Sequence, residues 1–193
     1  MIQLDILHEK MRNCTLCSLH KNRTQVVPGL VSNSEICIIG EAPGREEDRR
    51  GEPFVGRSGN ILDDMLSEIG LDRSSVSILN IVKCRPPENR DPTHEEIAQC
   101  SSYWLNPQLD IIKPKIVVTL GRVALNYFIP SAKITKVAGE PQELPTFTLL
   151  PLFHPAYILR NMGILETYKD HFKILQLLLR APRKGQLNLD EFF

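Results

Sequence analysis

Four short apolar runs, rich in β-branched side chains, recur along the chain with longer, more polar stretches between them. Runs of this length and composition are typical of buried β-strands, so we expect four strands. The runs are EICIIG from Glu35, SILNIV from Ser77, KIVVTLG from Lys115 and FTLLPLF from Phe147.

Helical patterns lie between these runs. Residues 59–69 (GNILDDMLSEI) carry apolar side chains at the spacing of one helix face, and residues 163–180 show the clearest amphipathic pattern. Thr93 and Glu96 predict a helix start through a capping box, and a short helix is expected over residues 121–128. The alternation of strands and helices indicates a three-layer α/β/α fold, with helices on both sides of a central, mostly parallel, four-stranded sheet.

Polar residues stand where three of the predicted strands end. Glu41 follows the first run, Asn80 lies in the second, and His154 follows the fourth. Ligands of open α/β sheets bind at the carboxyl ends of the strands. We therefore expect these three side chains to converge on one site.

The composition narrows the class of protein. With 193 residues, 42% of them hydrophobic, the chain suits one globular domain. Its 23 basic and 23 acidic residues cancel, which argues against a purely electrostatic DNA binder. It has no apolar run of about 18 residues, the length that a membrane span requires. The first residues lack the features of a secretory signal, so we expect a cytoplasmic protein whose cysteines are reduced or bind metal.

The five cysteines divide into a candidate metal site and one isolated thiol. Cys14 and Cys17 form a C-x-x-C pair, and Cys84 and Cys100 follow later in the chain. Four thiolates suit either structural zinc or an iron–sulfur cluster, and the spacing does not decide between them. Four unrelated buried thiols are the alternative. Cys37 lies inside an apolar run, where cysteine usually acts as a small hydrophobic residue.

Three longer motifs carry a family resemblance. GEAPGREEDRRGEPFVGRSGNILDDML, NIVKCRPPENRDP and LFHPAYILRN closely resemble, in order and in register, the family 4 uracil-DNA glycosylases. The resemblance implies the uracil-DNA glycosylase fold and a [4Fe–4S] cluster held by Cys14, Cys17, Cys84 and Cys100. It also implies a monomeric enzyme that hydrolyses the N-glycosidic bond of uracil in single- and double-stranded DNA. The resulting abasic site starts base excision repair.

The resemblance also implies roles for the three residues at the strand ends. His154 matches the histidine that donates a hydrogen bond to uracil O2 as negative charge builds on the leaving base. Asn80 matches the residue that pairs with uracil N3–H and O4, a pattern that cytosine reverses. Glu41 occupies the position from which family members orient the attacking water.

Further positions in the motifs match residues of the family's pocket and DNA-binding loop. Phe54 corresponds to the aromatic residue that stacks on the flipped base. Ala42 stands where some other glycosylase families place a catalytic aspartate. On the loop that enters the minor groove, Leu159 would wedge into the base stack and Arg160 would contact the DNA. The remaining matches to the pocket are Gly40, Glu47 and Asn89, and basic residues such as Lys83, Arg85 and Arg90 are expected near the docked DNA.

Three alternatives are open to test. The covalent variant of the superfamily has an extra basic loop after the second strand, which CRPPENRDP lacks. The family 5 enzymes lack a carboxylate at the position of Glu41. A non-catalytic iron–sulfur domain of the replication machinery would not need Glu41, Asn80 and His154 together.

The last residues form a separate motif. The domain is expected to span residues 1–180, followed by a linker and tail over residues 181–193. The tail resembles the PCNA-interacting peptide, in which a glutamine, an aliphatic residue and two aromatic residues bind the sliding clamp. Packing of the two phenylalanines on the enzyme's own surface is the alternative, and a clamp peptide of this kind suggests an archaeal-type source. The matching residues are Gln186, Leu189, Phe192 and Phe193.

Overall fold

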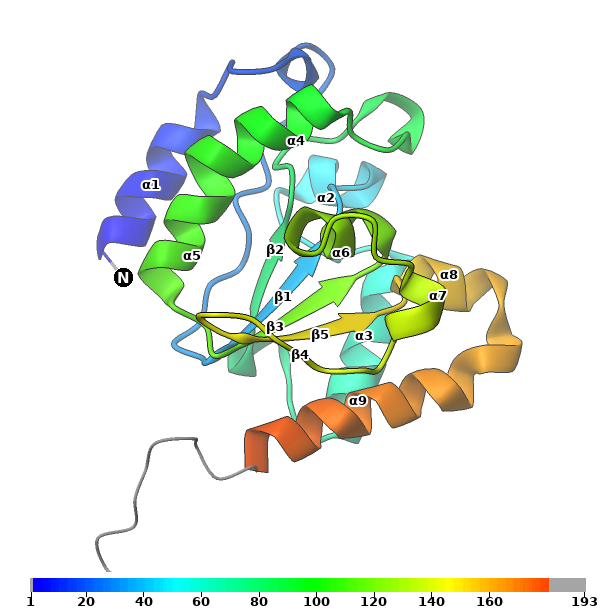
Figure 1. Cartoon of the computed structure of the whole chain (residues 1–193). Helices are drawn as coiled ribbons and strands as arrows, with labels where there is room; N and C mark the ends of the chain where they lie inside the picture. The colour runs from blue at the N-terminus through cyan, green and yellow to red at the C-terminus, as the bar shows by residue number, and fades with distance from the viewer. Residues whose placement is uncertain (1, 181–193) are drawn as a thin grey trace, which may run out of the picture.

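The computed structural model describes residues 2–180, in which a twisted sheet lies between two layers of helices (Figure 1). The strands run in the order β2-β1-β3-β5-β4, and β1, β2, β3 and β5 are parallel to one another. These four are the strands that the sequence predicts. Their bounds are β1 Ile36–Gly40, β2 Ser77–Asn80, β3 Ile116–Leu120 and β5 Thr148–Leu152.

The fifth strand corrects the prediction of a four-stranded sheet. β4, Gln142–Glu143, is two residues long and pairs antiparallel with β5 at the sheet edge. A strand this short, half-buried or exposed, leaves no alternating hydrophobic pattern in the sequence.

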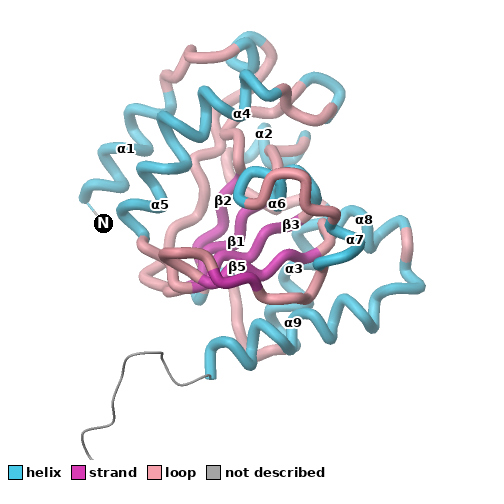
Figure 2. The backbone as a smooth tube through the Cα atoms, viewed as in Figure 1, coloured by secondary structure: helices cyan, strands magenta, loops and turns pink. Residues whose placement is uncertain are grey.

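Alternation along the strands divides the core into one cluster on each face of the sheet. Ile38 and Val118 pack with α3, α8 and α9 on one face. Cys37 and Val117, one position earlier, pack with α1, α5 and α6 on the other face. Figure 2 shows the strands enclosed in this way by helices. The helix bounds are α3 Arg57–Glu68, α8 Pro155–Arg160, α9 Leu165–Arg180, α1 Ile2–Arg12, α5 Asn106–Ile112 and α6 Arg122–Phe128.

The predicted helices are present with shifted ends. α3 begins two residues before the predicted start, and α9 follows a 3₁₀ turn, Met162–Ile164. The capping box predicted at Thr93 and Glu96 is formed and opens α4. A π-helical turn, Ser101–Leu105, links α4 to α5. The other elements are α4 His94–Cys100, α2 Arg45–Arg50, α7 Ile134–Val137 and the 3₁₀ turns η1 Ser18–Lys21, η2 Arg73–Ser75 and η3 Pro87–Asn89.

The parallel strands bring the predicted polar residues to one edge. In register, Gly40 at the end of β1 faces Asn80 at the end of β2. Beyond β5 the chain turns at His154, which caps the N-terminus of α8. Within residues 2–180, no helix is long and apolar enough to cross a membrane.

Candidate active site

A cavity of about 450 Å³ opens at the carboxyl ends of β1, β2 and β5. Three elements that are far apart in the sequence therefore supply its walls, as the strand pattern predicts. The lining residues include nine of those predicted for the pocket or the DNA: Glu41, Ala42, Glu47, Phe54, Asn80, Asn89, Arg90, His154 and Arg160.

Two predicted residues lie beside the cavity but do not line it. A Cβ atom on Gly40 would lie 2.5 Å from Asn80 Oδ1 and 2.6 Å from the ring of Phe54. Gly40 thus leaves room for two side chains of the pocket. Leu159 is half-buried on α8.

His154 is held as a neutral imidazole of known orientation. Its Nδ1 accepts a hydrogen bond of 3.1 Å from the backbone N–H of Ala156, so the neutral ring carries its proton on Nε2. Burial, with a smaller effect of Arg160, lowers the pKa of His154 to about 4. The ring is therefore uncharged at neutral pH and keeps one N–H for a ligand. Gly121, at φ 90°, allows close approach, because a Cβ there would lie 3.1 Å from the Cβ of His154.

Asn80 presents an unsatisfied amide oxygen. The residue is buried, and its Oδ1 has no hydrogen-bond partner within the described part of the chain. Its backbone carbonyl accepts a 2.8 Å hydrogen bond from the ammonium of Lys83. Because a buried polar atom is costly to leave unpaired, Asn80 suits a ligand that brings an N–H into the cavity.

Glu41 interacts with a carboxylate that sequence reasoning missed. Burial and the neighbouring carboxylate of Asp91 raise the pKa of Glu41 to about 7, and Arg122 opposes them. Arg122 also forms an ion pair with Asp91. Arg122 stands just beyond the end of β3, which was a usable signal, but Asp91 follows η3, where the sequence suggested only a turn.

Phe54 provides an aromatic wall beside His154. The two ring centroids are 5.7 Å apart with planes 29° from parallel. Glu47 holds the following residues, because its Oε1 accepts hydrogen bonds of 2.9 Å from the backbone N–H groups of Val55 and Gly56. A planar ligand that enters the cavity would meet the Phe54 ring, the His154 N–H and the Asn80 amide together.

Comparison with known proteins agrees with this geometry. Residues 28–178 match the family model described as "Uracil DNA glycosylase superfamily". The chain belongs to the uracil DNA glycosylase superfamily. It is similar to curated type-4 uracil-DNA glycosylases over most of its length, which confirms the family that the motifs indicate.

Three of these relatives show the extent of the similarity. A type-4 enzyme of Thermotoga maritima is 48% identical over 162 residues, covering 82% of this chain and 84% of the relative. One of Archaeoglobus fulgidus is 40% identical over 183 residues, covering 90% and 92%. One of Sulfurisphaera tokodaii is 41% identical over 195 residues, covering 95% and 88%.

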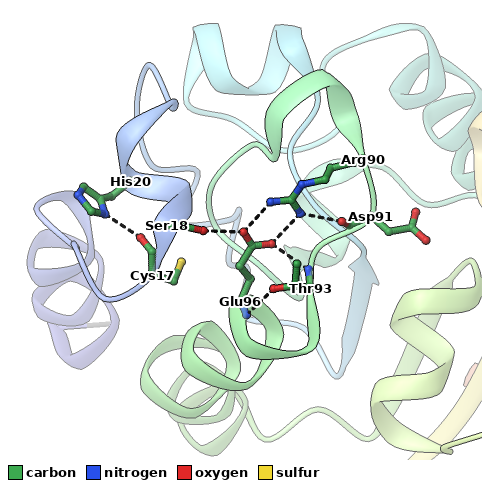
Figure 3. A network of polar contacts seen from close by, with 7 residues as sticks. All are labelled: Cys17, Ser18, His20, Arg90, Asp91, Thr93 and Glu96. Atoms are coloured by element: carbon green, nitrogen blue, oxygen red, sulfur yellow. Dashed lines mark hydrogen bonds and ion pairs between the residues drawn. The ribbon is translucent and has the colours of Figure 1, made fainter.

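In this superfamily member, the cavity wall after β2 is fixed by an ionic network (Figure 3). Arg90, which lines the cavity, donates to both carboxylate oxygens of Glu96 at 2.8 and 2.7 Å. The hydroxyl of Ser18, next to Cys17, donates to the same carboxylate at 2.8 Å. Glu96 therefore ties the cavity wall to the segment that carries the first two cysteines.

Two basic residues near this wall, Arg85 and Lys83, have different surroundings. Arg85 donates a 2.7 Å hydrogen bond to Asn89 Oδ1, and Asn89 adopts a left-handed backbone at φ 54°. Lys83 is only 1% exposed, so its prediction as a surface residue near DNA is wrong. Its stem and ammonium instead lie between the second strand and the cysteines.

Cys14, Cys17, Cys84 and Cys100 (the cysteine site) line one hollow, together with apolar side chains such as Met11 and Leu19. The isolated Cys37 is fully buried in β1, in the hydrophobic role that the sequence predicts. No group of three or more His, Cys, Asp or Glu residues between positions 2 and 180 has a geometry that would hold a metal ion.

N–H donors surround the cysteine site. The backbone N–H of Lys83 donates to Cys100 Sγ at 3.2 Å, and Trp104 Nε1 donates to Cys14 Sγ at 3.2 Å. Arg23 Nη1 donates to Cys84 Sγ at 3.3 Å. Such donors stabilise thiolates rather than thiols. This is the form in which four cysteines would bind a shared, positively charged metal centre.

Proposed function

We propose that the protein is a monofunctional uracil-DNA glycosylase, which flips uracil out of DNA and hydrolyses its N-glycosidic bond. The observation that carries the proposal is the convergence of an unpaired Asn80 amide and a neutral His154 beside Phe54 in one cavity. The type-4 names of its relatives support the same activity. The product is an abasic site, which starts base excision repair.

Recognition of uracil follows from the amide and the ring. Uracil N3–H would donate to Asn80 Oδ1, while the amide N–H₂ would donate to uracil O4. Cytosine presents the opposite pattern at both positions and would leave buried polar groups unpaired, at about 1–3 kcal/mol each. Stacking on Phe54 adds about 1–3 kcal/mol for any base, so the amide supplies the discrimination.

Bond cleavage requires stabilisation of two charges. As the bond between C1′ and N1 breaks, both of its electrons leave with the base, and negative charge builds on uracil O2. The Nε2–H of His154 would donate to O2, which a neutral imidazole does without prior loss of a proton. The deoxyribose becomes cationic, and the carboxylate of Glu41 would stabilise that charge and orient the water that adds to C1′. One proton of the water stays on the new C1′ hydroxyl and the other passes to Glu41 or to solvent, while the uracil anion takes up a proton from solvent after its release.

We further propose a [4Fe–4S] cluster at the cysteine site. Cys14, Cys17, Cys84 and Cys100 would hold it, and the three N–H donors to their sulfurs support this assignment. The cluster would tie α1 and the segment after it to α4 and so stabilise the domain of residues 1–180. Purified protein should be brown. Colourless protein that contains zinc would overturn the cluster and leave the glycosylase proposal intact.

The proposal assigns further partners. Arg160, at the cavity, would contact DNA, and Leu159 would enter the vacated base stack of single- or double-stranded substrates. The tail residues Gln186, Leu189, Phe192 and Phe193 lie outside the described residues, and we propose from their spacing that they bind a PCNA clamp of archaeal type. We also propose a monomer in the cytoplasm, where thiolate ligands stay reduced.

The activity is tested by uracil release from a single-stranded oligonucleotide and from a duplex with one G·U pair. Asn80→Ala and His154→Ala should each reduce single-turnover release about 100-fold or more. Asn60→Ala and His94→Ala, at exposed positions on α3 and α4, are matched controls and should release uracil at the wild-type rate. Absence of release by the cluster-containing wild type on both substrates would favour a non-catalytic iron–sulfur domain.

A further inference from the structure

The aromatic wall of the cavity is built on an uncommon backbone conformation. Phe54 has φ 53°, in the left-handed region that residues other than glycine rarely occupy. It is nevertheless 4% exposed, with its ring against His154 and above Gly40. Such a conformation persists only where its surroundings hold it in place.

The side chain of Arg73 binds the carbonyl groups at this position. Arg73 lies in η2, beyond the end of α3, and does not line the cavity. Its Nη1 donates to the carbonyl of Pro53 at 3.0 Å, and its Nη2 donates to the carbonyl of Phe54. Nε donates to Asp63 Oδ1 at 2.7 Å, which orients the guanidinium from α3. All three nitrogens of the guanidinium are thus engaged.

Close packing brings α3 against the same carbonyl. A Cβ atom on Gly59 would lie 1.8 Å from the carbonyl oxygen of Phe54, so only glycine fits there. Glu47 binds the next two backbone N–H groups on the opposite side. The Phe54 loop (residues 53–56) is therefore held through its carbonyls by Arg73 and through its amides by Glu47.

We propose that Arg73 is a positioning residue for uracil excision: by binding the carbonyls of Pro53 and Phe54, it holds the Phe54 ring in the orientation that stacks on the flipped base. The inference rests on the proposed glycosylase activity. It predicts that Arg73 acts on the reaction only through the Phe54 ring. A residue that merely stabilises the fold would affect the reaction whether or not that ring is present.

A double-mutant cycle tests the inference. Arg73→Met removes all donors but keeps an apolar stem, and Phe54→Ala removes the ring. Arg73→Met should reduce the single-turnover rate of uracil release roughly 5- to 50-fold, which is within the range expected for loss of a base–aromatic stack. In the Phe54→Ala background, Arg73→Met should reduce this rate by no more than about a further twofold. Equal losses in the two backgrounds would overturn the inference.

Three further measurements separate positioning from general damage. The melting temperature should fall by a similar amount when Arg73→Met is introduced with or without the Phe54 ring. Affinity for DNA that already contains an abasic site should match the wild type, because no base stacks there. Arg73→Lys, which keeps one donor, should recover part of the rate if Arg73→Met folds poorly.

A matched arginine and the wild type complete the test. Arg12→Met, which removes an exposed ion pair with Glu9, should leave release unchanged. If the wild type releases no uracil, the glycosylase proposal fails and this inference fails with it. If the wild type is active and Arg73→Met releases uracil at the same rate, only the proposed role of Arg73 is overturned.

Discussion

Arg90 and Glu96 form a bidentate ion pair, in which Nη1 of Arg90 donates to Oε2 of Glu96 at 2.8 Å and Nη2 donates to Oε1 at 2.7 Å. The Glu96 side chain is 4% exposed, whereas that of Arg90 is 41% exposed and reaches the cavity. Ser18 and the backbone N–H of Thr93 complete the hydrogen bonds of the carboxylate. One buried carboxylate thus joins the wall of the uracil cavity to the cysteine segment.

Glu96 should make the protein sensitive to acid. Its hydrogen bonds, above all with Arg90, lower its pKa from 4.5 to about 2. Its contribution to the free energy of unfolding is therefore full above pH 4.5 and is lost as pH falls from 4.5 toward 2. At neutral pH, Glu96→Gln should destabilise the protein by about 1.5–3 kcal/mol, measured by urea unfolding.

The same variant supplies the pH test. The stability difference between wild type and Glu96→Gln should shrink when unfolding is repeated from pH 5 to pH 3. Glu95→Gln, at the neighbouring exposed position, should match the wild type throughout. A difference that stays constant with pH would show that the carboxylate charge is not what stabilises this network.

Glu41 should set the acidic limit of activity. With its pKa raised to about 7, the carboxylate becomes protonated as pH falls through 7, so kcat/KM should fall there too. The effect on stability has the opposite sign: the native state holds a proton between pH 4.5 and 7 that the unfolded state lacks, so this group stabilises the fold at lower pH. Glu41→Gln should be slow and lack the acidic limb near pH 7.

Two neighbours of Glu41 should move that limb in opposite directions. Asp91 raises the pKa of Glu41 and Arg122 lowers it. Asp91→Asn should therefore shift the acidic limb of kcat/KM to lower pH, and Arg122→Met should shift it to higher pH. Asp110→Asn, an exposed aspartate on α5, serves as the control. Shifts of the same sign in both variants would contradict the assignment of the limb to Glu41.

The imidazole of His154 should titrate well below an ordinary histidine. Burial lowers its pKa from 6.5 to about 4, so the native state excludes a proton that the unfolded state binds between these values. This group therefore costs stability as pH falls below 6.5. Nitrogen NMR of labelled protein at pH 7 should show a neutral ring protonated at Nε2. A doubly protonated ring at that pH would mean that His154 acts as a cation.

Local sequence patterns predicted the four parallel strands because these strands are buried on both faces of the sheet. The runs at Ile36 and Ile116 stand out in sequence for that reason, and Thr93 with Glu96 marks a helix start within one turn. The helix α2, REEDRR, carries no apolar stripe and was missed. α1 was missed as well, although its Leu4 and Met11 are buried.

The parts of the site that were missed depend on side chains far apart in sequence. Arg73 meets the carbonyl of Phe54 nineteen positions away, and Arg122 meets Asp91 thirty-one positions away. No local spacing encodes such pairs. Lys83 was misplaced for a related reason, since a charged residue in a loop is normally exposed. Here a turn places it inside, where its ammonium binds the carbonyl of Asn80.

If the cysteine site holds a [4Fe–4S] cluster, Trp104 should tune its reduction potential. Its indole N–H donates to Cys14 Sγ at 3.2 Å, and such donors stabilise the more negative, reduced cluster. Trp104→Phe should lower the potential measured by protein-film voltammetry and leave uracil release unchanged. Tyr103→Phe, at the exposed preceding position, should leave both the potential and uracil release unchanged. An unchanged potential in Trp104→Phe would show that this bond does not reach a cluster sulfur.

The tail should be separable from catalysis. Deletion of residues 186–193 removes Gln186, Leu189, Phe192 and Phe193 together, and none of these is among the residues proposed for catalysis. Uracil release from short oligonucleotides should stay at the wild-type rate, while binding to an archaeal PCNA ring, measured by calorimetry, should be lost. Asn188→Ala, at a position outside the motif, should bind the clamp normally. Equal clamp affinity of the truncated and full-length proteins would contradict the proposal that the tail binds the clamp. A lower melting temperature of the truncated protein would instead indicate that the phenylalanines pack on the enzyme itself.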